Sequence, residues 1–166
     1  MPNIKYIKSG TLLDFWFPCQ LEGFHSVGHR VLYDKLLHHN CVDAAKTLIR
    51  SSHNPKTLAT LARQALTSAE ADLVSLWAHV APAVELAAYL ARADVDLRFS
   101  EALLSTGQDI LAYVSASNAE TGIGTHHDEP ALWTRNTTGK VLMQARAVLE
   151  MQKDITHPHL LPDTLG

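Results

Sequence analysis

The feature that most constrains the fold is a long alanine- and leucine-rich stretch between Ala69 and Ala93. Pro82 lies inside it, and proline removes a helix hydrogen bond, so the stretch predicts one kinked helix or two helices in succession. No uninterrupted apolar run approaches the ~20 residues that a membrane span requires. We therefore expect a core helix and not a membrane helix. Its larger apolar residues recur at helical spacing, at Leu73, Leu76, Trp77, Val80, Val84, Leu86 and Leu90.

Shorter patterns on both sides of this stretch predict further helices and two short strands. Helices are expected over residues 27–37, 42–49, 55–66, 99–104 and 138–151. Ser26 is a typical N-cap, and Asn54 followed by Pro55 is a strong signal for the start of a helix. Residues 3–8 alternate like a strand, and residues 110–115 form an apolar run. These patterns predict an α+β fold that is predominantly helical, with a small sheet.

Composition favours one ordinary globular domain. The 166 residues are 46% hydrophobic and 19% charged, which excludes a disordered chain, and the net charge of -3 argues against bulk nucleic-acid binding. We expect one domain over residues 1–150 and a C-terminal tail over residues 151–166. The N-terminus lacks the apolar region of a signal peptide, and neither Cys19 nor Cys41 belongs to a CxxC pair. A cytoplasmic location, free thiols and no cofactor are therefore expected.

Three segments resemble the motifs of one family. Phe24-x-Ser26-Val27-Gly28-His29, with Lys35 shortly after, is similar to an opening motif F-x-S-x-E-H followed by a lysine. Residues 103–124 resemble a middle motif that ends in D-x-x-W-G-x-G, and residues 136–146 resemble a closing motif N-x-L-G-x-x-L-M-x-x-R. The family is NADAR (NAD- and ADP-ribose-associated), also called the YbiA-like N-glycosidases. The resemblance spans about residues 12–150.

The resemblance implies a compact helical fold that hydrolyses an N-glycosidic bond to ribose. Such cleavage passes through an oxocarbenium-like centre, which a nearby carboxylate stabilises, and the departing base needs a proton. An aromatic side chain gives the base or the ribose a stacking surface. However, Gly28, Asn118 and Thr121 stand where the motifs have glutamate, aspartate and tryptophan. Because losing one charged catalytic group typically costs ~2.7–4 kcal/mol, we expect catalysis to be impaired.

Other motif residues are retained, and the resemblance implies that they bind the ligand. Glycines let the backbone approach a phosphate closely, and lysine and arginine pair with phosphate oxygens. Structural roles are the alternatives: a helix N-cap for Ser26, a solvated helix face for Lys35, and an ion pair or loop cap for Arg146. The expected ligand-binding residues are Ser26, His29, Lys35, Gly122, Gly124, Asn136 and Arg146.

Three functions remain open from the sequence. The first is a catalytically impaired domain that binds a ribose- or ADP-ribose-type nucleotide. The second is an active N-glycosidase with a relocated acid, for which Glu22, Glu120 and His29 are candidates. The third is an interaction or assembly protein, with a protein partner or a second copy of itself, in a viral particle or in host defence. His25 and His29 are spaced to chelate a metal, but no third ligand accompanies them, so no metal site is expected.

Overall fold

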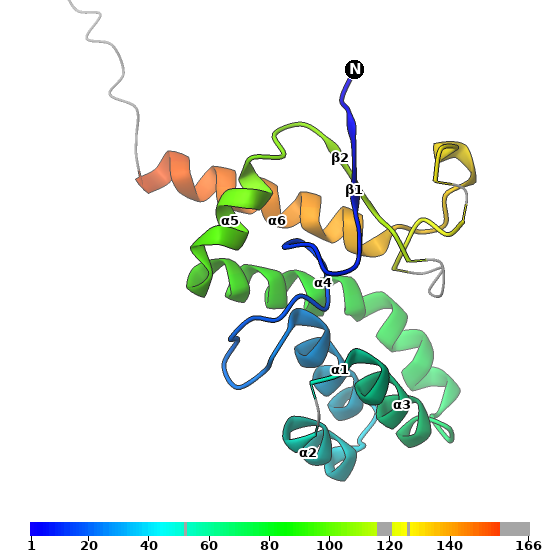
Figure 1. Cartoon of the computed structure of the whole chain (residues 1–166). Coiled ribbons are helices and arrows are strands. Elements are labelled where there is room, and N and C mark those ends of the chain that lie inside the picture. Colours follow the sequence, from blue (N-terminus) through cyan, green and yellow to red (C-terminus); the bar gives the residue numbers. More distant parts are fainter. Residues whose placement is uncertain (52, 116–120, 126, 157–166) are drawn as a thin grey trace, which may run out of the picture.

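The structure is a computed structural model that describes residues 1–51, 53–115, 121–125 and 127–156 (Figure 1). Its secondary structure confirms the predicted fold class, since helices dominate and the described strands form one small sheet. In chain order the elements are β1 Ile4–Ile7, α1 Val27–His38, α2 Val42–Arg50, α3 Pro55–Ala65, α4 Ala71–Val95, α5 Leu97–Leu104, β2 Ile110–Tyr113, the 3-10 turn η1 Pro130–Leu132, and α6 Thr137–Thr156.

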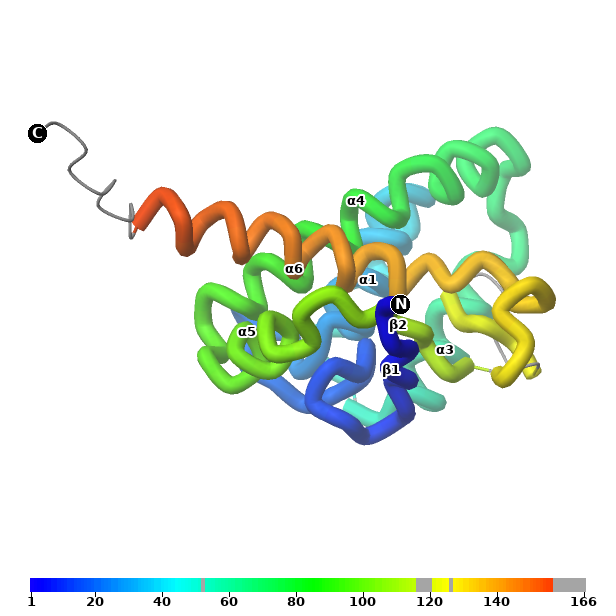
Figure 2. Tube along the Cα trace, turned by 90° about the horizontal axis from the view of Figure 1, so that it is seen from above, coloured from blue at the N-terminus to red at the C-terminus, as the bar shows by residue number. Residues whose placement is uncertain are grey.

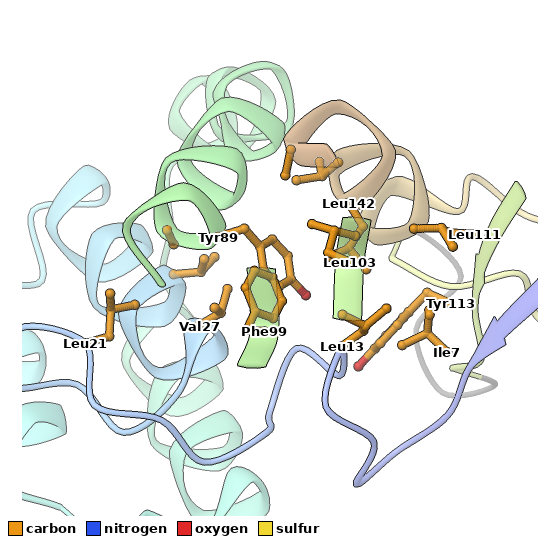
Figure 3. Packing of buried hydrophobic residues seen from close by; sticks show 14 of the residues in the cluster. Ile7, Leu13, Leu21, Val27, Tyr89, Phe99, Leu103, Leu111, Tyr113 and Leu142 are labelled. Atoms are coloured by element: carbon orange, nitrogen blue, oxygen red, sulfur yellow. The ribbon is translucent and has the colours of Figure 1, made fainter. Parts of the chain in front are cut away.

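Helix α4 is the central element. It continues through Pro82 as one helix, so the alternative of two helices in succession is wrong. It packs against α1 on one side and α6 on the other (Figure 1). The main hydrophobic core gathers around it, and there the ring of Tyr89 stacks on Phe99 at 5.7 Å (Figure 3). A second, smaller cluster joins α1, α2 and α3 around Leu36 and Leu48.

The two strands are parallel, although most of the chain separates them. Ile4 pairs with Ile110 and Ile7 with Tyr113, and β2 in turn packs on α6. Figure 2 shows the two strands side by side, with the last turns of α6 projecting from the body of the molecule. Helix α6 ends at Thr156, five residues beyond the predicted end at Met151.

By length and composition, α4 could cross a membrane, with a mean hydropathy of 1.4 over its most apolar 18 residues. This is weak evidence, because core helices pass the same test. The C-terminal half of α4 packs into the core and buries the side chains of Glu85 and Arg92. The C-terminal half of α4 thus belongs to the core, whereas only 17% of the apolar window is buried and Val74 and Leu76 in the N-terminal half are about half exposed. Both cysteines, Cys19 and Cys41, are free thiols, as expected.

Candidate functional site

A cleft of about 800 Å³ opens where the loop before α1 meets the start of α5. Its volume lies in the range of small-molecule sites, which is about 300–1,000 Å³. The residues that give it chemical character are Trp16, His25, Ser26, His53, Asp96 and Arg98. The cleft therefore combines aromatic and imidazole rings, one carboxylate and one guanidinium group.

Two of these side chains begin helices. The Ser26 hydroxyl accepts a hydrogen bond from the backbone N–H of His29 at 3.0 Å, which confirms the predicted N-cap of α1. Asp96 does the same for α5, because its Oδ1 accepts from the backbone N–H of Phe99 at 3.2 Å. Capping side chains satisfy amide groups that helix ends leave unpaired. Both polar groups are thus fixed in position at the cleft.

Gly28 lies directly beneath the indole of Trp16. A Cβ atom built on Gly28 would come within 2.5–2.7 Å of three carbons of the six-membered ring, too close for any side chain without movement. The backbone also joins the two segments, since the N–H of Gly28 donates to the carbonyl of Phe15 at 2.9 Å. The position where the family motif has glutamate is therefore covered by tryptophan.

His29 is fully buried, and both of its ring nitrogens have partners. Nδ1 accepts from the backbone N–H of His25 at 3.2 Å, so Nε2 carries the proton and donates to the carbonyl of Leu48 at 3.0 Å. Burial lowers the pKa of His29 below its usual value, and the hydrogen bond to Leu48 opposes this only in part. His29 is therefore held neutral and joins α1 to α2, with no nitrogen left for a ligand.

His25 and His53 are the imidazoles that face the cleft. Their rings contact each other, and His25 also stacks on His29 at 5.7 Å. Burial, and then the neighbouring His53, lower the pKa of His25. Among the described residues, no group of three or more His, Cys, Asp or Glu side chains could hold a metal ion.

Asp96 is the carboxylate of the cleft, and the sequence analysis missed it. Its Oδ2 accepts from both Nε and Nη2 of Arg92 at 3.4 Å, while Arg98 lies 3.9 Å from Oδ1. Arg92 is completely buried, with its guanidinium 4.3 Å from the ring centre of Phe99. The sequence did hold one signal for Asp96: it directly precedes an amphipathic helical pattern, which is the position of an N-cap.

Of the relocated acids proposed from the sequence, Glu22 does not line this cleft. The Glu22 side chain is 74% exposed, lies 3.5 Å from Arg30, and lines a second hollow of about 500 Å³ that also borders α4. Glu120, like Asn118, lies outside the described residues. Lys35 is half-buried on α1 and is not among the residues that line the cleft.

The closing motif performs structural work at the sheet. Asn136 adopts a positive φ of 48°, donates from Nδ2 to the carbonyl of Leu111, and accepts at Oδ1 from the N–H of Tyr113, each at 2.9 Å. Its side chain thus pairs with the backbone of β2. Gly139 has no room for a side chain, because a Cβ atom there would collide with the carbonyl of Leu111.

Arg146 has a structural role of the kind considered above. Only 8% of it is exposed, and its Nη1 donates to the Thr106 hydroxyl at 2.7 Å and to the carbonyl of Asp109 at 3.0 Å. It therefore fixes the turn between α5 and β2 to α6. The predicted ligand-binding residues consequently fall into two groups, one on α1 and one around α6, and only Ser26 lines the cleft.

The remaining predicted positions lie in the segment before α6. Gly122 packs so closely on Ser115 that a Cβ atom would collide with it, and Gly124 adopts a φ of +78°. The carbonyl of Thr121 accepts from the N–H of Thr138 in the first turn of α6. These contacts make the segment a brace for α6, with backbone geometry that requires glycine at position 124.

Comparisons with known proteins agree with this fold. The family model of the NADAR domain matches residues 11–150. The NMR structure of the E. coli protein YbiA superimposes with a TM-score of 0.69 at 19% sequence identity, covering 97% of this chain and 94% of that one. A search of curated proteins found no significant match. Because the family model covers most of the sequence, the chain belongs to the NADAR family.

Proposed function

We propose that this NADAR domain binds a ribosylated nucleotide of the ADP-ribose type in the cleft between the Ser26 and Asp96 helix caps, with little or no cleavage of the N-glycosidic bond. One observation carries the proposal. The indole of Trp16 covers Gly28, so the cleft has a built aromatic wall where the family's opening motif has an acid.

The cleft supports binding through the kinds of group that it brings together. A planar base stacks on indole or imidazole rings, which Trp16, His25 and His53 supply. The Asp96 carboxylate is suited to accept hydrogen bonds from ribose hydroxyls. Arg98, with its side chain 79% exposed at the edge of the cleft, is suited to pair with phosphate oxygens.

Impaired cleavage follows from position 28. Glycine supplies no carboxylate to stabilise an oxocarbenium-like centre or to activate water. The closest motif histidine, His29, is no substitute, since both of its nitrogens are occupied. Losing one such group costs about 10²–10³ in rate, and Asn118 also replaces the motif aspartate, so the two losses together would remove most of the activity.

Calorimetry with ADP-ribose at concentrations up to the millimolar range tests binding, and chromatography of ribosylated nucleotides tests cleavage. We expect saturable heat with no release of free base. Arg98→Ala should weaken binding severalfold, whereas Arg63→Ala, an exposed arginine on α3 away from the cleft, should not. Absence of heat together with an unchanged melting temperature would refute the proposal.

A second candidate is an active N-glycosidase that uses Asp96 as its relocated acid. The observation in favour is that this carboxylate lines the same cleft as Ser26 and His25. Its ion pair with buried Arg92 fixes the carboxylate in position, and a fixed carboxylate can stabilise a positive centre. Release of base by the natural chain and its loss in Asp96→Asn, with folding intact, would select this function over the first.

A further inference from the structure

We infer that Trp16 is the residue that recognises the ligand's base, so that the cleft selects nucleotides with a planar heterocycle over sugar phosphates without one. This inference rests on the proposed function, because it names the part of the ligand that one wall of the cleft holds.

The indole is held face-on against α1. The three ring carbons nearest to a Cβ on Gly28 are bonded in a row and lie at almost equal distances from that point. Such equality places the point over the face of the ring and not at its edge. The face of the indole therefore packs directly on Gly28, and the ring cannot move closer to the helix.

The ring is also fixed from its own segment. Phe15 packs against it edge to face, with ring centres 5.1 Å apart, and the Phe15 carbonyl accepts the N–H of Gly28. The indole joins the hydrophobic cluster between α1, α2 and α3 and remains half-buried, with part of its surface lining the cleft. A rigid aromatic wall loses little conformational freedom when a ligand stacks on it.

Trp16 is the only tryptophan of this cleft. Trp77 lines the second hollow beside α4, and the Trp133 indole donates to the carbonyl of His127 and packs near Tyr6. A base that stacks in the cleft should therefore perturb the emission of one tryptophan out of three. Asp96 and Arg98, at the start of α5, line the same cleft and supply one charge of each sign.

The test uses the double variant Trp77→Phe/Trp133→Phe, which leaves Trp16 as the sole tryptophan. We expect AMP and ADP-ribose to quench its fluorescence saturably, and ribose 5-phosphate to leave it unchanged. Trp16→Leu should weaken ADP-ribose binding about tenfold, which equals ~1.4 kcal/mol, while Trp16→Phe stays within about threefold of the natural chain. Circular dichroism establishes that each variant is folded.

The outcomes separate this inference from the function on which it rests. If calorimetry detects ADP-ribose binding but the Trp16 emission does not respond, base recognition by Trp16 is refuted and nucleotide binding stands. The same holds if ribose 5-phosphate binds as tightly as ADP-ribose, or if folded Trp16→Leu binds as well as the natural chain. If no nucleotide produces heat in the natural chain, both proposals fail together.

Discussion

Replacing Glu85 by glutamine should remove a pH-dependent weakness in the core. Glu85 lies on α4 with only 5% of its surface exposed, and its Oε1 has no hydrogen-bond partner among the described residues. Burial raises the pKa of Glu85 from 4.5 to about 7, which the Thr138 hydroxyl offsets only in part. The folded state therefore holds a proton that the unfolded chain releases above pH 4.5.

The magnitude follows from linkage. Below pH 4.5 the raised pKa does not lower the free energy of unfolding, because the carboxyl group is protonated in both the folded and the unfolded chain. Between pH 4.5 and 7 the unfolded state gains about 1.4 kcal/mol for each pH unit, so this one group lowers the free energy of unfolding by about 3 kcal/mol at pH 7 and above. Stability is thus lost as the pH rises, which is opposite to the effect of an ion-paired acid.

Urea unfolding at several pH values from 4.5 to 8, followed by circular dichroism, measures this effect. The difference in unfolding free energy between Glu85→Gln and the natural chain should grow by about 3 kcal/mol in favour of the variant over that interval. Any constant cost of burying the amide appears equally at both ends and cancels. Glu101→Gln, an exposed position on α5, is the matched control and should show no such growth. Parallel curves for Glu85→Gln and the natural chain would refute the reasoning.

Four further predictions concern the α1 and α6 segments. Gly28→Glu should lower stability by about 1–3 kcal/mol, because the new side chain displaces the Trp16 ring, and Trp16→Ala in the same chain should restore part of the loss in a double-mutant cycle of melting temperatures. Ser26→Ala should cost about 1 kcal/mol in urea unfolding by removing the α1 cap, and an unchanged midpoint would contradict that role. Arg146→Met should destabilise the chain by about 1–3 kcal/mol and increase hydrogen exchange in the turn before β2, because Asp109 and Thr106 lose their donor. His29 has a lowered pKa in the folded state, so its contribution to stability is complete above pH 6.5 and declines as the pH falls; His29→Gln should flatten this decline in pH-dependent unfolding.

Local signals in the sequence were sufficient for the helix starts. Ser26 and Asn54 accept backbone hydrogen bonds where the cap patterns predicted, because capping depends on residues two or three positions apart. Such local signals could not decide whether Pro82 would interrupt the helix, because that depends on packing against distant segments. A single proline costs about 3 kcal/mol in a helix, and packing of α4 on α1 and α6 outweighs it.

The candidate site was less accessible to sequence reasoning. The resemblance identified position 28, but the cover over it comes from Trp16 on a preceding loop, and no spacing rule joins the two. His53 and Asp96 reach the cleft from elements far apart in the chain, which only the tertiary fold brings together. Conversely, Asn136 and Arg146 were recognised as motif residues, although a motif alone does not separate a ligand contact from the bracing of β2 and its adjoining turn.

The parallel pairing of β1 with β2 has a consequence for biosynthesis. During translation β1 emerges from the ribosome long before Ile110–Tyr113 is synthesised. The backbone of β1 therefore has no strand to pair with while α1 to α5 are synthesised. The helices can form early from local contacts, whereas joining the two strands closes a loop that contains nearly all of them and is expected to come late. A fusion partner placed directly before Ile4 would therefore interfere with the last step of folding more than with the first.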